Sequence, residues 1–425
     1  MMKDIIPLSV PYLGEEEARA AGEAVASGWV TQGPRVKAFE DAFAEYTGAP
    51  FACAVSSCTA ALHLALLSAG VSPGDVVATV SHSFIATANA VRYCQAEPVF
   101  VDIDPATRNM DPAALARSIN GDFEERNGSL WYKHVARIAV GESPLRGRSG
   151  ASGRLAAILV VHQVGLPADL SAILAIADHF NTPVIEDAAC AIGSEIRIGD
   201  DWEKIGQPHG DVACFSFHPR KVITTGDGGM LATNNPEYDR RFRLLRHHGM
   251  SVSDAARHRS DKVVFEDYPI TAYNYRMTDI QAAVGIEQMK RLPEIVHKRG
   301  LIASKYMDAL AGLPGLQLPA VPPFARTNWQ SFIVRLIGSR GRDSVIEAMQ
   351  NSGISTRRGV MCSHLEPPYA KGWPRGSLPA SEAGREFDII LPLFPAMTDP
   401  QVQAVATALA AAVGSSHFPK SSRIR

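Results

Sequence analysis

The stretch Pro183-Val-Ile-Glu-Asp-Ala-Ala189 and the stretch Cys214-Phe-Ser-Phe-His-Pro-Arg-Lys221 decide the fold of this chain. The first is an apolar run that ends in Glu186 and Asp187, and it predicts a short buried strand. The second predicts another short strand over residues 212–217, followed by a polar loop that carries Lys221. In open α/β sheets, ligands bind beyond the carboxyl ends of the strands. We therefore expect Asp187 and Lys221 to face one pocket.

An acid and a lysine that share a pocket suit the chemistry of pyridoxal 5′-phosphate (PLP). A lysine can capture the aldehyde as a Schiff base, and an aspartate can keep the pyridine nitrogen protonated. Both residues also have simpler interpretations. An aspartate after a strand often caps a helix, and a lysine in a polar loop is usually just solvated. Taken alone, Asp187 and Lys221 leave these alternatives open.

The alternation of strands and helices defines the fold class and the domain division. From about residue 50 to 235, short apolar strands alternate with helices, which predicts a mostly parallel sheet with helices on both faces. A long helix over about 293–310 is expected to link this part to a smaller α+β domain. Because 425 residues exceed the usual size of one core, we assign residues 1–255 to a large domain and 256–425 to linker helices and a small domain.

The composition is that of an ordinary globular enzyme or binding protein. Hydrophobic residues make up 46% and charged residues 20%, and the formal net charge of −2 gives no reason to expect nucleic-acid or membrane binding. The six cysteines are scattered and favour a reducing compartment over a disulfide framework or a zinc site. With no apolar signal core and no membrane-length run, a cytoplasmic protein without a metal site is expected.

Two further segments have both a functional and a structural interpretation. Ser56-Ser-Cys-Thr59 follows a predicted strand and begins a helix, where free amides and hydroxyls can hold a phosphate; simple Ser/Thr capping explains the same residues. Phe84 is either a core aromatic or a side chain that stacks on a flat ring.

Residues 120–154 interrupt the strand–helix alternation with a Gly/Ser/Arg-rich, aperiodic sequence. Because Trp131 and Tyr132 rarely stay fully solvated, we expect an ordered excursion near the active site or the subunit interface. Its basic residues could cover a diphosphate.

Six motifs, in this order, resemble those of the DegT-type sugar aminotransferases, PLP enzymes of the aspartate aminotransferase fold (fold type I). The resemblance is strong from about residue 10 to 300. The motifs are Gly-Trp-Val-Thr-Gln-Gly-Pro (28–34), Ser-Ser-Cys-Thr-Ala-Ala-Leu (56–62), Ser-His-Ser-Phe-Ile-Ala-Thr (81–87), Val-Ile-Glu-Asp-Ala-Ala (184–189), Phe-Ser-Phe-His-Pro-Arg-Lys (215–221) and Tyr-Asn-Tyr-Arg-Met-Thr-Asp-Ile-Gln-Ala-Ala (273–283).

The resemblance implies a role for each matching residue. It implies that Lys221 is the Schiff-base lysine and proton carrier, that Asp187 pairs with the pyridine nitrogen and that Phe84 stacks on the ring. The implied phosphate ligands are Cys58, Thr59 and Ser216, with Asn274 supplied by the neighbouring subunit of a homodimer, and Thr31 is implied to lie near the cofactor and sugar. The chain departs from the family at Cys58, often Gly, at Cys190, often His or Gln, and at Asp227, often Glu.

The function implied is transfer of an amino group from an amino acid, by family likeness L-glutamate, to a nucleotide-linked keto-deoxysugar in amino-sugar biosynthesis. PLP and pyridoxamine 5′-phosphate would alternate. Lys221 favours transamination, because relatives that remove a hydroxyl carry His there. Transamination of a carbocyclic ketone and a non-catalytic PLP-binding sensor are the alternatives. Arg357 and Arg358 are candidates for gripping a carboxylate or phosphate, although adjacent arginines are as often solvated surface.

Overall fold

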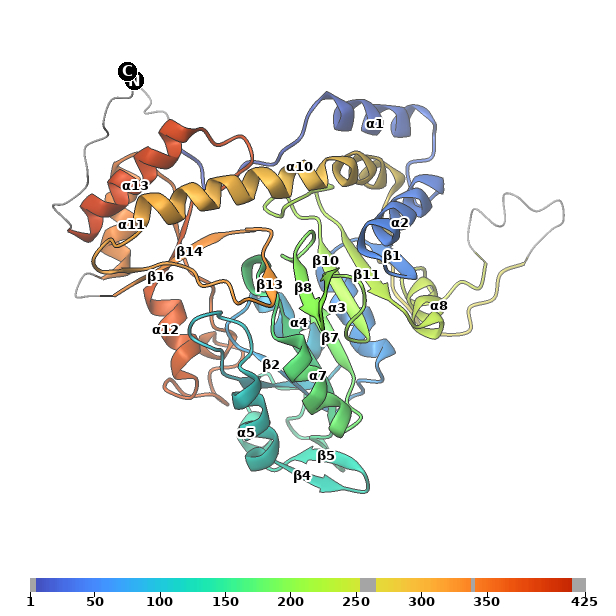
Figure 1. The fold of residues 1–425 in the computed structure, drawn as a ribbon. Helices are drawn as coiled ribbons and strands as arrows, with labels where there is room; N and C mark the ends of the chain where they lie inside the picture. Colours follow the sequence, from blue (N-terminus) through green and yellow to red (C-terminus); the bar gives the residue numbers. More distant parts are fainter. Residues whose placement is uncertain (1–4, 253–264, 338–340, 415–425) are drawn as a thin grey trace, which may run out of the picture.

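The computed structural model describes residues 5–252, 265–337 and 341–414. Its centre is a seven-stranded sheet in the order β1-β11-β10-β7-β6-β2-β3 (Figure 1). Strands β10, β7, β6, β2 and β3 run parallel, and β11 is antiparallel to both of its neighbours. The mostly parallel sheet is therefore confirmed. The strands are β1 (Phe51–Val55), β2 (Val76–Val80), β3 (Glu97–Val101), β6 (Leu155–Val161), β7 (Val184–Asp187), β10 (Val212–Ser216) and β11 (Gly229–Thr233).

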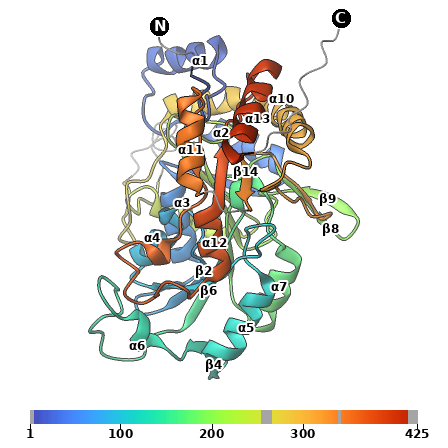
Figure 2. The same cartoon turned by 90° about the vertical axis from the view of Figure 1, so that its left-hand side faces the viewer.

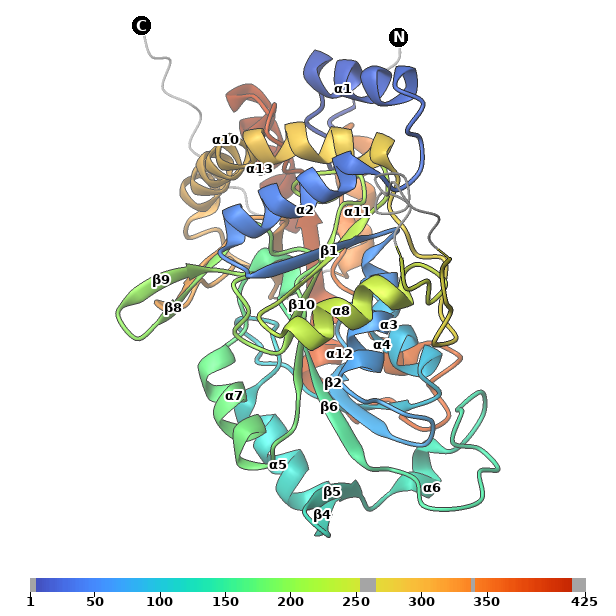
Figure 3. The ribbon, with the colours of Figure 1, turned by 90° about the vertical axis from the view of Figure 1, so that its right-hand side faces the viewer.

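Helices cover both faces of this sheet (Figure 3). One face packs against α2 (Pro34–Thr47), α5 (Pro112–Asp122) and α7 (Leu170–His179) and forms the first core. The other packs against α3 (Cys58–Ser68), α4 (Ile85–Tyr93) and α8 (Pro236–Leu245) and forms the second core. Burial on both faces explains why these strands are continuously apolar instead of alternating.

Helix α10 (Asp279–Leu310) joins the large and small parts of the molecule. The sequence predicts two helices here, the second starting near Pro293, but the structure has one 32-residue helix with Pro293 inside it. A proline removes one backbone donor from a helix. The fully buried Leu292 and Ile295 on either side hold the helix against the first core, which stabilises it across the proline.

The small part is a four-stranded sheet in the order β12-β14-β16-β15, with its own third core. Its strands are β12 (Leu316–Gln317), β14 (Phe332–Leu336), β15 (Arg357–Arg358) and β16 (Asp388–Leu391). The surrounding helices are α11 (Arg342–Asn351), α12 (Pro379–Phe387) and α13 (Asp399–Val413). The amino-terminal helix α1 (Glu15–Ala26) lies along α10 (Figure 1).

A second small sheet projects from the side of the molecule (Figure 2). It consists of the hairpin β8 (Glu195–Ile198) and β9 (Asp201–Lys204), to which β13 (Ala325–Arg326) is added. Within the ranges described, no helix combines the length and the apolar composition that crossing a membrane requires.

The 120–154 excursion is ordered, and within its own chain it lies at the end of the sheet opposite to Asp187. It contains a hairpin, β4 (Phe123–Arg126) and β5 (Ser129–Tyr132), and the short helix α6 (Val135–Ile138). The turn residues Asn127 and Gly128 have φ of 50° and 72°, as expected for an Asn-Gly hairpin turn.

The hairpin is fixed near the residues that precede β2 and β6: Tyr132 N donates to Gly153 O, and Gly153 N donates to Gly74 O, both at 2.7 Å. These are the amino ends of the parallel strands, whereas Asp187 lies at a carboxyl end. The Arg137 guanidinium lies 4.2 Å from the centre of the Trp373 ring. Within its own chain this segment therefore lies away from Asp187, and its position at a subunit interface stays a prediction.

Candidate active site

Asp187 and Lys221 meet at the carboxyl ends of two neighbouring parallel strands. Asp187 is the last residue of β7 and pairs in register with Cys214 of β10, and the loop after β10 carries Lys221. The Lys221 Nζ atom lies 3.1 Å from the Sγ atom of Cys190, three residues beyond Asp187. Asp187 caps no helix, because turns follow β7, and Lys221 is only partly exposed. Both simpler interpretations of these residues are therefore wrong.

The Asp187 carboxyl is buried and held by two donors. Thr87 Oγ1 donates to it at 2.7 Å and Ala189 N at 3.2 Å. Burial raises the pKa of Asp187, and the Thr87 hydroxyl and the Lys221 charge offset part of that rise. A cationic group placed against this carboxylate would be stabilised strongly, because few waters compete with it.

Two opposing effects act on the Lys221 amine. Burial alone would lower its pKa, but the Cys190 sulfur, and beyond it the Asp187 carboxylate, raise the pKa above the ordinary value. The neighbours therefore hold the amine in its protonated form until another group takes the proton.

Glu186, next to Asp187, has a structural role. It is fully buried and accepts hydrogen bonds from His162 Nε2 at 2.9 Å and from Gly210 N at 2.7 Å. His162 Nδ1 accepts from Ala168 N at 3.0 Å, so Nε2 carries the proton. The two carboxylates of the first motif thus point to different sides of the strand, as alternation requires.

The N-terminus of α3 forms a cradle of free donors. Ser57 caps the helix, since its hydroxyl accepts from Ala60 N at 3.1 Å. Across the part of the chain that the structure describes, no acceptor is bonded to the amides of Cys58 and Thr59 or to the Thr59 hydroxyl. Burial raises the pKa of the Cys58 thiol well above its ordinary value, so the sulfur stays uncharged. The capping interpretation of this segment is therefore confirmed, and the free donors leave the phosphate interpretation as a prediction.

Gly229 brings this cradle to Ser216. It is paired in register with Val55 on one side and Ser216 on the other. A Cβ atom on Gly229 would lie 2.4 Å from the carbonyl carbon of Ser57 and 2.6 Å from Cys58 N. Only glycine permits this approach, which places the start of α3 beside the end of β10.

Phe84 is not a core residue, because its side chain is 67% exposed. It is the N-cap residue of α4, and its carbonyl accepts from the amide of Thr87, whose hydroxyl binds Asp187. The aromatic ring is thus fixed by the helix that also orients the buried acid.

Asn274 and Thr31 are exposed in the single chain. Tyr273 and Tyr275 flank Asn274 and pack against His63 of α3. In an extended segment successive side chains point to opposite sides, so Asn274 faces away from its own subunit. Thr31 lies in the loop before α2, and its carbonyl accepts from Asp279 N at 2.9 Å.

Three residues that shape the site were missed from the sequence. Asn328 donates to the carbonyls of Cys190 and Ile192, each at 2.8 Å, and fixes the loop that carries Cys190. Gln330 Nε2 donates to Arg220 O at 2.6 Å and fixes the Lys221 loop. Asp279 binds the amides of Gly33, Arg35 and Val36 and holds the loop that contains Thr31.

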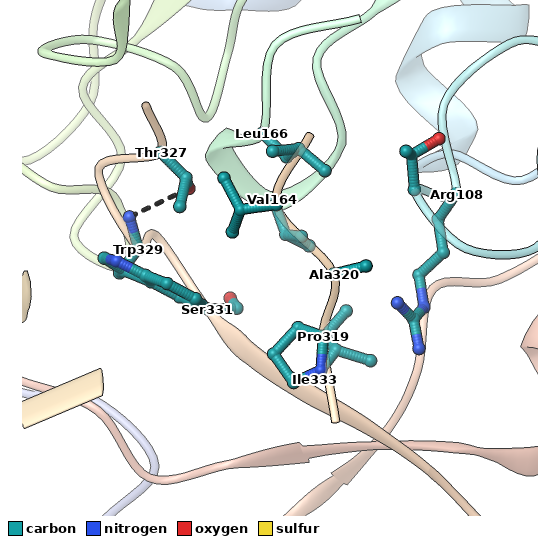
Figure 4. A pocket seen from close by; sticks show the side chains of 11 residues that line it. Arg108, Val164, Leu166, Pro319, Ala320, Thr327, Trp329, Ser331 and Ile333 are labelled. Atoms are coloured by element: carbon teal, nitrogen blue, oxygen red, sulfur yellow. Dashed lines mark hydrogen bonds between the residues drawn. The ribbon is translucent and has the colours of Figure 1, made fainter. Parts of the chain in front are cut away.

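A small pocket lies next to this site but is separate from it (Figure 4). Trp329, Val164 and Leu166 line it on one side and Arg108 on the other. Thr327 Oγ1 accepts from Trp329 N at 3.1 Å at its rim. Neither Lys221 nor Asp187 lines this pocket.

Comparison with known proteins identifies the family. The model of the DegT/DnrJ/EryC1/StrS aminotransferase family matches residues 11–410. The chain belongs to this family. It is 32% identical to the aminotransferase TlmJ from Streptoalloteichus hindustanus, with 97% of this chain and 99% of TlmJ covered and a TM-score of 0.78. It is 31% identical to DesV from S. venezuelae, covering 95% of this chain and 98% of DesV with a TM-score of 0.78.

A further similar structure is the PLP form of Spr1654 from Streptococcus pneumoniae, named as a candidate sugar aminotransferase. It is 25% identical, covers 96% of this chain and 98% of its own, and has a TM-score of 0.80. Membership of the DegT/DnrJ/EryC1/StrS family makes the protein an aminotransferase of fold type I, as the sequence resemblance predicted.

The site residues of this family member fit PLP. Free amides at a helix N-terminus are a ready anion site for a phosphate, and a buried carboxylate at a strand end suits a protonated ring nitrogen. The partly buried amine of Lys221 is a group that can react with an aldehyde when it is deprotonated. The groups lie on one edge of one sheet, so a single planar cofactor can reach all of them.

Proposed function

We propose that this protein is a PLP-dependent aminotransferase that moves the amino group of L-glutamate to a nucleotide-linked keto-deoxysugar. The position of Lys221 and Asp187 at the ends of neighbouring parallel strands, beside the free amides of α3, carries the proposal. The sugar class is supported by the similarity to Spr1654, which is named as a candidate sugar aminotransferase.

PLP, when bound, supplies an aldehyde that captures the amino group and a ring that accepts electrons. In its free form the Lys221 Nζ atom would move the proton between the Cα atom of the donor and C4′ of the cofactor, and the reverse transfer would deliver a proton to the acceptor carbon. Asp187 would keep the ring nitrogen protonated, and Phe84 would stack against the ring.

The phosphate is held by Cys58 N, Thr59 N and Oγ1, and Ser216 Oγ. We propose that Asn274 completes this phosphate site from the neighbouring subunit of a homodimer, because it points away from its own chain. Thr31 lies near the cofactor and the sugar in the same assembly.

Absorbance of the bound cofactor tests the reaction. The holoenzyme should lose its long-wavelength band on addition of L-glutamate and regain it with a nucleotide keto-sugar, with a keto-inositol as the comparison substrate. Lys221→Ala should fold, bind PLP weakly and show neither change. If only the keto-inositol restores the absorbance band, the acceptor is a carbocyclic ketone and not a sugar. If Lys221→Ala still turns over, the proposed role of Lys221 is wrong.

Hybrid dimers test the shared site. Lys221→Ala and Asn274→Ala subunits, each inactive alone, are unfolded together and refolded. If Asn274 serves the neighbouring subunit, half of the sites in the hybrid carry neither substitution and activity returns. If Asn274 serves its own chain, every site in the hybrid carries one substitution and no activity returns.

A further inference from the structure

Three arginines gather beside the Lys221 loop without acidic partners. Arg220 directly precedes Lys221, and Arg357 and Arg358 form β15. All three side chains are exposed, and throughout the described ranges none of them forms an ion pair. Arginines on this protein's surface otherwise commonly pair with carboxylates, as Arg240 does with Glu237 and Arg117 with Asp111.

In the small sheet, Arg357 lies at the end of the strands that faces the Lys221 loop. Arg357 and Ile333 both pair with Ile390, from opposite sides of β16. Because β16 is antiparallel to both of its neighbours, β14 and β15 run in the same direction. Their first residues therefore lie at the same end of the sheet. Gln330 lies just before β14 at that end and binds Arg220 O at 2.6 Å. Arg220 and Arg357 are therefore near each other across the junction of the two parts.

The electrostatics agree with this placement. Burial and the charges of Arg220 and Arg358 lower the pKa of Arg357. Arg220 likewise contributes to lowering the pKa of His218, after burial. Arg220 and Arg357 repel each other, and an anion that binds between them would turn this repulsion into a favourable interaction.

Two polar groups without hydrogen-bond partners lie at the same end of the sheet. Gln330 is 9% exposed, and its Oε1 atom is buried without a partner, as is Thr356 Oγ1 next to Arg357. A buried polar atom without a partner is costly unless a ligand or water satisfies it. Thr356 can donate to an anion, and Gln330 Oε1 can accept from a hydroxyl or amine of the same ligand.

We propose that Arg220 and Arg357 form an anion subsite at the mouth of the active site that binds carboxylate or phosphate oxygens of a substrate. This proposal rests on the proposed function and names the anchoring contact of its substrate. Guanidinium groups bind both kinds of oxyanion in bidentate geometry. The anion is either a carboxylate of the amino donor or the diphosphate of the nucleotide-linked acceptor.

Binding of non-reactive probes to the PLP holoenzyme tests the subsite without catalysis. Inorganic pyrophosphate and glutarate are titrated calorimetrically into wild type, Arg220→Gln and Arg357→Gln. Arg117→Gln, on the exposed face of α5, is the matched control. Both site variants should lose at least about tenfold in affinity for the same probe, with unchanged PLP content, and the control should bind as wild type. If the substitutions weaken the binding of pyrophosphate, the anion is the diphosphate of the acceptor. If they weaken the binding of glutarate, the anion is the carboxylate of the amino donor.

The subsite is overturned if wild type binds neither probe, if the site variants bind both probes like wild type, or if Arg117→Gln loses as much affinity. The half-reaction with L-glutamate, followed by cofactor absorbance, separates this result from the proposed function. Arginine-dependent probe binding without any amino-group transfer would leave the subsite standing and reject the function. Normal amino-group transfer, combined with probe binding that does not depend on the arginines, would support the proposed function and reject the subsite.

Discussion

The sulfur of Cys190 lies 3.1 Å from the Nζ atom of Lys221. Cys190 is also the one cysteine of the six that is not buried. Its loop is held by Asn328, which in turn requires Gly165, because a Cβ atom there would lie 1.9 Å from Asn328 Oδ1. The thiol is thus placed against the reactive amine by contacts that come from three separate segments.

Cys190→Ala should make the Lys221 amine less basic. The Cys190 sulfur raises the pKa of Lys221 against the lowering effect of burial, so its removal lets the pKa fall. The rate at which apoprotein captures PLP should then rise with pH about one decade per unit, as before, but with the whole profile displaced to lower pH. Stopped-flow absorbance measures this profile. Cys94→Ala, which removes a buried thiol away from Lys221, is the control, and an unshifted profile for Cys190→Ala would contradict the coupling.

Asp187→Asn should slow catalysis while stabilising the apoprotein near neutral pH. Burial raises the pKa of Asp187 in the folded state, so the carboxyl favours folding when protonated, and this contribution is lost as the pH rises through the raised pKa. A neutral amide removes the cost of the buried charge, but it cannot keep a ring nitrogen protonated, so activity should fall by about 10²-fold or more.

Thermal unfolding of the two apoproteins across pH checks the sign of the Asp187→Asn effect. The advantage of the variant should shrink as the pH falls through the raised pKa. An advantage that grows toward acid pH would mean that the carboxylate is stabilised, not destabilised, by its surroundings.

Gly229→Ala should displace the phosphate cradle. The new Cβ atom would meet backbone atoms of Ser57 and Cys58 at 2.4–2.6 Å, and backbone cannot move aside as a flexible side chain can. Overpacking of this kind costs about 1–3 kcal/mol, and PLP affinity should fall with it. Urea unfolding and equilibrium dialysis measure the two effects. Gly300→Ala in α10 meets nothing within 4 Å and should gain up to about 1 kcal/mol; equal losses in both variants would refute the close-packing argument.

Asp279→Ala should release the loop that carries Thr31. The carboxylate accepts hydrogen bonds from three backbone amides, those of Gly33, Arg35 and Val36. Their loss should cost about 2–3 kcal/mol in the free energy of unfolding and should make residues 28–36 sensitive to proteases. Asp308→Ala, an exposed position in the same helix, should change neither quantity. If residues 28–36 remain resistant to proteases in Asp279→Ala, other contacts hold this loop.

The central part of the fold follows from local sequence. The strands around Asp187 and before Lys221 are short apolar runs with sharp polar ends. The strand before Lys221 ends one residue earlier than predicted, and the other lies inside the predicted run 183–189. Asn127-Gly128 is a strong hairpin signal, yet the surrounding Gly/Ser/Arg-rich sequence concealed it. Pro293 marks a helix break by propensity, but burial of its neighbours overrides propensity there.

The contacts that finish the site could not be found in this way. Asn328 and Gln330 lie more than 100 residues from the loops they hold, and nothing in their own segment distinguishes them from ordinary polar residues. Whether Phe84 is buried or exposed depends on what packs over it, which periodicity does not reveal. Roles that arise from tertiary packing between distant segments have no local signature.

Helix α10 has a consequence for how the molecule responds to its cofactor. Its first half packs Leu292 and Ile295 into one core, and its second half packs Ala303 and Tyr306 into another. Because these halves belong to one helix, a rotation of one lobe relative to the other must bend or shift α10. Occupancy at Lys221 should therefore slow amide exchange with deuterium around Tyr306, in the lobe that carries neither Lys221 nor Asp187.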